Sequence, residues 1–213
     1  MLITLAIIGI ISSMVIPGLL NQTNDNELKT AWKKEFAVLS QDFALILNDK
    51  AGSIKNSCPS VDWLPDTECL TNEFISKLAV RKYCPSINGN SRDCWFIHAP
   101  AIETHQMGGT ADYVVWSPGY PAIVLNDGAL VSFFGGKSDC SVVGGHFSNE
   151  CLQIAVDVNG FKGPNIIGKD IFAIHVREDK LVPYGVNDGY QNDCNSNPPS
   201  GTGYGCAAQY LLQ

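Results

Sequence analysis

The sequence predicts an α+β protein in which one long N-terminal helix packs against an antiparallel β-sheet. Three observations lead to this prediction. Residues 1–50 contain no cysteine and follow a helical pattern, short apolar segments bounded by turn residues follow from residue 112 onward, and all eight cysteines lie beyond residue 57. The chain therefore divides into a helix over residues 1–50 and a globular head over residues 51–213.

The first twenty residues, Met1–Leu20, carry no charge. At about 1.5 Å of rise per residue, such a helix matches the hydrocarbon thickness of a bilayer. A cleavable secretory signal would need a basic segment before the apolar run and a small-residue cleavage site, and this stretch has neither. We therefore expect a transmembrane helix over residues 1–20. Pro17-Gly18 should kink or locally melt it, because proline removes a backbone donor.

An amphipathic second half of the helix follows the polar residues 21–26. Its apolar side chains recur at steps of three and four: Leu28, Trp32, Phe36, Leu39, Phe43, Ile46 and Leu47. Charged residues, among them Lys33, Lys34 and Glu35, take the other positions. This half is expected to pack on the head, and Ala51-Gly52 is expected to end the helix.

The head is predicted to begin with irregular structure and one short helix over residues 71–81. Strands are expected over residues 112–116, 122–125, 129–134, 151–158, 171–177 and 181–184. Asn126-Asp127-Gly128 is a strong hairpin signal, and short turns between consecutive strands favour an antiparallel meander. The eight cysteines lack the close Cys-x-x-Cys pairs of zinc sites, which favours disulfides formed in an oxidising compartment.

The composition and the motifs exclude several classes of function. A net charge of −7 and a pI near 4.9 argue against electrostatic binding of nucleic acid, since no basic stripe could neutralise phosphates. Gly-x-Ser-x-Gly, phosphate-loop and dinucleotide motifs are absent, and the four histidines are scattered. The chain is therefore predicted not to be an enzyme, with no catalytic and no cofactor-binding residue.

The residue order in LITLAIIGIISSMVIPGLL closely resembles the N-terminal helix shared by type IV pilins and type II secretion pseudopilins. In that family a basic leader ending in glycine, a phenylalanine that becomes the methylated N-terminus, and a glutamate precede this run. Met1 is therefore expected to be an internal methionine of the motif, with the cleavage and methylation site upstream. Lys29, Lys33 and Lys34 follow the apolar run and by themselves favour a cytoplasmic head, whereas the cysteines place the head outside.

The resemblance implies a pilin-like fold and a structural subunit of a type IV pilus or a type II secretion pseudopilus. Close helix contacts in the fibre would involve Leu2, Ile3, Leu5, Ile7, Ile8, Gly9, Ile10, Ile11, Val15, Ile16, Pro17 and Leu19. The implied partners are other pilin-like subunits, an inner-membrane assembly platform, a prepilin peptidase and membrane lipid. The implied location is the bacterial inner membrane, with the head in the periplasm or on the cell surface.

Several alternatives stay open at this point. Another class of protein would also fit the sequence, namely a single-span anchored domain that binds a ligand or hydrolyses an extracellular polymer as a monomer. Under the family resemblance, the sequence does not choose between pilus and pseudopilus, or between a major and a minor subunit.

The cysteine spacing and the resemblance together suggest a disulfide pattern. Cys194 and Cys206 would close a short loop similar to the disulfide-bounded C-terminal loop of many pilins. For the other six cysteines we expect nearest neighbours to pair: Cys58 with Cys69, Cys84 with Cys94, and Cys140 with Cys151.

The segment from Asp157 to Asp170 resembles one found in several pilin-like proteins, with an Asp-x-Asn-Gly turn, then Gly-Pro-Asn and Gly-x-Asp. Since some pseudopilins hold calcium in their C-terminal loops, Asp157, Asn159 and Asp170 are candidate oxygen ligands. The alternative is that these short polar side chains hydrogen-bond their own backbone. That alternative is favoured, because the evenly spaced carboxylates and terminal glutamate of an EF-hand loop are missing.

Overall fold

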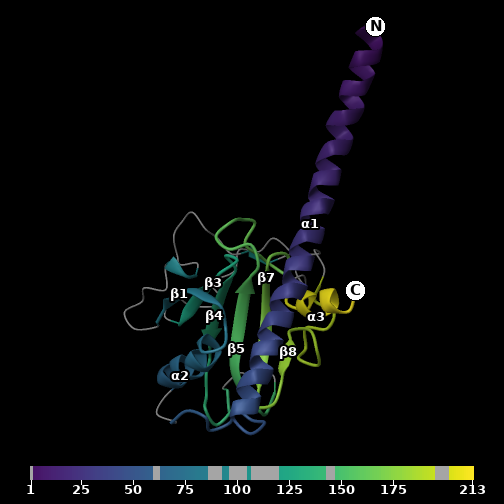
Figure 1. The fold of residues 1–213 in the computed structure, drawn as a ribbon. Coiled ribbons are helices and arrows are strands. Elements are labelled where there is room, and N and C mark those ends of the chain that lie inside the picture. The colour runs from purple at the N-terminus through teal and green to yellow at the C-terminus, as the bar shows by residue number, and fades with distance from the viewer. Residues whose placement is uncertain are drawn as a thin grey trace.

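The long N-terminal helix α1 runs from Leu2 to Asp49 without a break (Figure 1). The computed structural model describes residues 2–59, 63–85, 93–95, 105–106, 120–142, 147–194 and 202–213, and of residues 2–22, 63–64 and 105–106 it describes the backbone alone. Local melting at Pro17-Gly18 was expected and is wrong, because one missing backbone bond leaves the neighbouring turns of a 48-residue helix paired. Figure 1 shows the N-terminal part of α1 projecting beyond the sheet and its second half lying against it.

The second half of α1 buries its predicted apolar stripe. Leu28, Trp32, Leu39, Phe43 and Ile46 are all buried. The helix ends as predicted, since the amide of Gly52 donates to the carbonyl of Leu47, and Ala51 and Gly52 both have positive φ. This left-handed ending is the usual way for a helix to satisfy its last carbonyls. Glu35 departs from the predicted pattern, because it too is buried.

The second helix, α2, spans Trp63–Ile75 and not the predicted residues 71–81. Pro65 and Asp66 lie in its first turn, where a proline loses no intrahelical bond and an acidic side chain suits the helix dipole. The end of the predicted helix belongs instead to strand β1, Val80–Cys84. Pairing of β1 with β3 across the sheet therefore overrides the short helical stripe that ends at Leu78.

The sheet has the strand order β1-β3-β4-β5-β7-β6-β2, and β8 also pairs with β7. Its further strands are β2 (His105–Gln106), β3 (Ala122–Leu125), β4 (Leu130–Phe134), β5 (Glu150–Asp157), β6 (Ile166–Ile167), β7 (Ile171–Arg177) and β8 (Leu181–Pro183). Strands β3, β4, β5, β7 and β8 follow the predicted strands closely, and the α+β class is confirmed. The predicted strand over residues 112–116 lies outside the described residues.

One edge of the sheet differs from the predicted antiparallel meander. β6 pairs parallel with β7, and β2 pairs parallel with β6. The short strand β6 lies inside the connection between β5 and β7. The amide of Ile166 in β6 donates to the carboxylate of Asp170, and the amide of Gly168 donates to the carbonyl of Ile171 in β7, so this connection is held beside β7. Two-residue strands carry too little pattern for sequence periodicity to reveal them.

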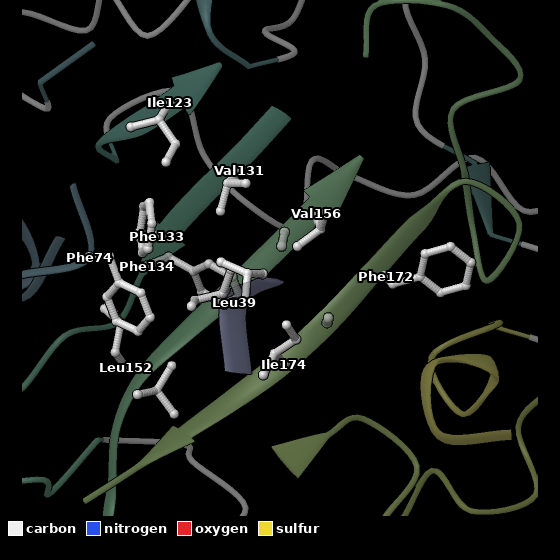
Figure 2. Packing of buried hydrophobic residues seen from close by; sticks show 14 of the residues in the cluster. Leu39, Phe74, Ile123, Val131, Phe133, Phe134, Leu152, Val156, Phe172 and Ile174 are labelled. Carbon is white, nitrogen blue, oxygen red and sulfur yellow. The ribbon is translucent and has the colours of Figure 1, made fainter. Parts of the chain in front are cut away.

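The core lies between the sheet and the two helices α1 and α2. Figure 2 shows Leu39 of α1 among buried side chains of the sheet, with Phe74 of α2 beside Phe133 of β4. Phe43 and Phe74 stack with ring centroids 5.7 Å apart, which joins the two helices. The last helix, α3 (Cys206–Leu211), packs against β7 and α1.

Four disulfides brace the head. They join Cys58 to Cys69, Cys84 to Cys94, Cys140 to Cys151, and Cys194 to Cys206, which are the nearest-neighbour pairs expected from the sequence. All eight cysteines are used. The last of these bonds ties Cys194, in the segment after β8, to Cys206, the first residue of α3, and α3 packs against α1.

Candidate functional site

The junction between α1 and the head is built around Trp32. The indole is fully buried, its Nε1 donates to the carbonyl of Ala207 at 2.9 Å, and its ring stacks on Phe172 with centroids 4.6 Å apart. Lys29 lies over the ring of Tyr210. Since Phe172 belongs to β7 and the other two partners to α3, one turn of α1 is fixed to two separate elements of the head.

The predicted assembly residues, Leu2 to Leu19, lie on the part of α1 that projects from the head (Figure 1). Their backbone is helical, but their side chains lie outside those that the structure describes. Within the described residues, no helix combines the length and the apolarity needed to cross a membrane. The prediction that residues 1–20 span a membrane therefore stays a prediction.

The three predicted oxygen ligands meet in the connection between β5 and β7. Asp170 accepts from the amides of Asn165 and Ile166 at 2.8 and 2.6 Å, and the amide of Asn159 donates to Asp157 at 3.1 Å. The side-chain amide of Asn159 reaches Asp170 at 3.3 Å. These bonds are the turn-stabilising role that the sequence favoured for these residues.

Hydrogen bonds do not account for every oxygen of this turn. Oδ2 of Asp157, Oδ1 of Asn159 and Oδ1 of Asn165 are buried without a hydrogen-bond partner. Burial, together with the nearby charge of Asp170, raises the pKa of the fully buried Asp157, and burial raises the pKa of Asp170. Two buried carboxyl groups and three unpaired oxygens make this turn costly unless a proton or a cation compensates it.

A second polar cluster, not predicted from the sequence, joins β5 and β7 to the segment that follows β8. Nδ1 of His175 lies 2.9 Å from Oε1 of Glu150, and Nε2 lies 3.0 Å from Oδ2 of Asp188. All three residues are buried, and Tyr184 stacks on the imidazole at 3.8 Å. Because carboxylates only accept hydrogen bonds, both ring nitrogens must carry a proton for both bonds to form.

The pKa of His175 follows from opposing effects. Burial lowers it, but the hydrogen bonds to Asp188 and Glu150 outweigh burial and raise it above its usual value. The pKa of Asp188 is lowered, because its bonds to His175 and to the amides of Tyr190 and Gly185 outweigh burial. Below the folded pKa of His175, the cluster is therefore a buried imidazolium held between two acidic groups, and it joins β5 and β7 to the segment after β8. A histidine between apolar neighbours in the strand Ile171–Arg177 was the available sequence signal.

Among the described residues, no three side chains of histidine, cysteine, aspartate or glutamate gather in a way that could hold a metal ion. A site in the β5–β7 turn would instead rely on two carboxylates together with asparagine and backbone oxygens. Of the other histidines, His98 and His146 lie outside the described residues, and only the backbone of His105 is described. No family model, no curated protein and no solved structure matches the chain.

Proposed function

We propose that this chain is a structural subunit of a type IV pilus or type II secretion pseudopilus, with a pilin-like fold. One observation carries the proposal: α1 is a single 48-residue helix whose second half is packed on a disulfide-braced head while its first half projects from it (Figure 1). The projecting half has the uncharged sequence of Met1–Leu20. A helix continued rigidly into the head suits a fibre subunit better than a tethered monomer, which needs only a flexible linker.

In the proposed mechanism, the apolar half of α1 first anchors the subunit in the bacterial inner membrane. Extraction into the fibre then replaces lipid contacts by contacts between helices, and Gly9, Ser12 and Ser13 permit close approach. A prepilin peptidase and an inner-membrane assembly platform are the proposed partners, together with other pilin-like subunits. The Trp32 junction transmits the position of the helix to the head, which would then face the periplasm or the cell surface.

The proposal predicts concentration-dependent filaments when detergent is removed from the native protein purified from its own membranes. Association of the apolar helices should produce particles that sediment and appear as fibres by electron microscopy. The N-terminal sequence and mass of the same sample should show the cleavage and methylation that a prepilin peptidase leaves. A preparation that stays monomeric at every concentration, with an unmodified N-terminus, would instead favour an anchored monomeric domain.

We also propose that the β5–β7 turn holds a calcium ion. The residues fit a hard cation, because the unpaired buried oxygens of Asp157, Asn159 and Asn165 are of the kind that calcium prefers. Asp157 and Asp170 would supply negative charge. The bound ion would remove the repulsion between these two buried carboxylates and would hold the segment beside β7.

Calcium is therefore expected to raise the melting temperature of the full chain. At a calcium concentration of about 100 times Kd, the shift should be about 5–10 °C relative to a chelator. Asp157→Asn should remove most of this response, whereas Asp139→Asn, at an exposed aspartate, should keep it. Differential scanning calorimetry with and without calcium measures both. Equal melting temperatures in calcium and in chelator would leave the turn with its hydrogen-bonding role alone.

A further inference from the structure

Glu35 is a buried acidic side chain on the face of α1 that packs against the head. It is 2% exposed. One carboxylate oxygen, Oε1, lies 3.2 Å from Nζ of Lys34, and the other, Oε2, is buried without a donor. Glu35 and Asp127 can hydrogen-bond each other only when one of the two carboxyl groups holds a proton. A buried, half-satisfied carboxylate costs stability, so its presence on an otherwise apolar stripe calls for an explanation.

Glu35 lines a pocket between α1 and the β3–β4 hairpin. The pocket measures about 180 Å³ and is lined by Glu35, Val38, Leu78, Ala79, Leu125, Asn126 and Asp127. Lys34 bridges the carboxylates of Glu35 and Asp127. Two carboxyl groups thus share one lysine, and the site keeps an excess of one negative charge when both are ionised.

The lining of the pocket defines the chemistry of its ligand. Val38, Leu78 and Leu125 offer apolar surface for an aliphatic chain, and Glu35 and Asp127 offer acceptors for an ammonium group. A lysine side chain combines these two properties, since it buries its methylene stem on apolar surface and places its charge at a polar end. We propose that this pocket receives a lysine side chain from a second copy of the chain.

Two observations favour a second copy as the source of this lysine. The pocket adjoins a flank of α1 that is exposed at Thr23, Asn26, Glu27, Thr30 and Lys34 and half-buried at Ala31. In a fibre built on α1, a neighbouring subunit would lie along this flank. The chain carries a net charge of −7, so copies repel each other unless a basic side chain meets an acidic site. This inference rests on the proposed fibre function.

Protonation of Glu35 gives the contact a distinctive signature. Burial, and after it the neighbouring Asp127, raises the pKa of Glu35 to about 7. Lys34 and Asp127 are the charged groups that face it, and the other lining residues carry no charge. An incoming ammonium favours the ionised carboxylate, so contact between copies should strengthen as pH rises through about 7.

The test is cross-linking between isotopically distinct copies of the native protein. Unlabelled and ¹⁵N-labelled protein are mixed in detergent, the detergent is removed, and a carbodiimide joins contacting carboxylates and amines without a spacer. Mass spectrometry should find hybrid peptides, one half labelled, that link a lysine to Glu35 or Asp127. Relative to hybrid links at exposed carboxylates in the same sample, their yield should rise between pH 6 and 8, about one unit on each side of the pKa of Glu35. The comparison within one sample removes the pH dependence of the carbodiimide reaction itself. Hybrid peptides are specific for contacts between copies, which separates them from the internal Lys34–Asp127 pair.

Two variants sharpen the test. Glu35→Gln should lower the hybrid cross-links to Asp127 by about tenfold or more and abolish their pH dependence, because the ammonium loses its buried partner. Asp179→Asn removes the same charge from an exposed turn and should leave both unchanged. At pH 8 the melting temperature of Glu35→Gln should be no lower than that of the unchanged chain. A carboxyl group whose pKa is raised by folding makes the folded chain less stable as pH rises and the group ionises, and glutamine does not ionise.

The outcomes separate this inference from the proposed function. Fibres with no hybrid link at Glu35 or Asp127, and with Glu35→Gln assembling as the unchanged chain does, would overturn the pocket contact and leave the fibre proposal standing. Hybrid links at these residues without fibres would support the contact and overturn the fibre. Neither fibres nor hybrid links would overturn both.

Discussion

Replacing His175 with leucine is expected to lower the free energy of unfolding by about 3–5 kcal/mol. In the structure the imidazole lies between Glu150 and Asp188 in a fully buried setting. Leucine keeps an apolar side chain in the strand but removes the cation between the two acidic groups. Both would then be held in a low-dielectric interior without the charge that offsets their desolvation.

The pH dependence of stability gives an independent signature of this cluster. The folded pKa of His175 is raised, so its contribution is fully present below its unfolded pKa of about 6.5 and is lost as pH rises through the folded pKa. The folded pKa of Asp188 is lowered, so its contribution is present above about 3.9 and is lost as pH falls. The cluster should therefore contribute most between about pH 4 and 6.5.

Urea unfolding of the full chain from pH 5 to 9 measures the loss of stability in His175→Leu and the decline of stability as His175 loses its proton. The unchanged chain should lose stability above neutral pH, and His175→Leu should show a flatter profile. A triple variant, Glu150→Gln, His175→Leu and Asp188→Asn, should recover part of the loss, because it removes the charges as well as their partner. If His175→Leu is as stable as the unchanged chain and has the same pH profile, the charge of His175 makes no net contribution to the stability of the fold.

Local signals predicted the sheet best. Asn126-Asp127-Gly128 turns β3 into β4 where expected, and β7 occupies the predicted residues Ile171–Arg177. The pairing of each cysteine with its nearest neighbour also followed from proximity along the chain. In each case the residues that decide the structure lie within about a dozen positions of one another, so sequence spacing carries the information.

The features that could not be predicted from the sequence depend on contacts between residues far apart along the chain. α2 stops at Ile75 and does not continue to residue 81 because Val80–Cys84 form β1, whose partner β3 lies some forty residues later. The cluster of Glu150, His175 and Asp188 joins residues that are 25 and 13 positions apart. No local periodicity records such contacts. The same holds for Glu35, because an acidic residue in an amphipathic helix is typical of the solvent face, whereas contacts with the head bury this one.

The β5–β7 turn could be predicted in part from the sequence. Asp157, Asn159 and Asp170 were grouped from their spacing, and the structure brings them together in one turn. The spacing could not show which oxygens the backbone would satisfy. In the structure both Oδ atoms of Asp170 accept from backbone amides, whereas Oδ2 of Asp157 has no partner. Which oxygens are satisfied depends on how the segment between the two aspartates folds against β7.

Replacing Trp32 with alanine is expected to destabilise the chain by about 3–5 kcal/mol and to loosen α1 from the head. The change would remove a fully buried indole, its stacking on Phe172, and its hydrogen bond to the carbonyl of Ala207. The carbonyl would be left buried, and a cavity would open between α1, β7 and α3. The loss therefore falls on the contact that joins the helix to the head.

Two control variants and two measurements separate the contributions at this junction. Trp32→Phe keeps an aromatic ring against Phe172 but loses the hydrogen bond, and should cost about 1–3 kcal/mol. Thr30→Ala, two residues away on the exposed face, should cost less than about 0.5 kcal/mol. Thermal unfolding gives the stability, and limited proteolysis between residues 23 and 50 reports how often α1 leaves the sheet.

If the position of the head in a fibre is set through this junction, Trp32→Ala should give filaments that are sparse or irregular even at temperatures where the head stays folded. Regular filaments from Trp32→Ala under those conditions would mean that the projecting half of α1 positions the subunit without help from the junction.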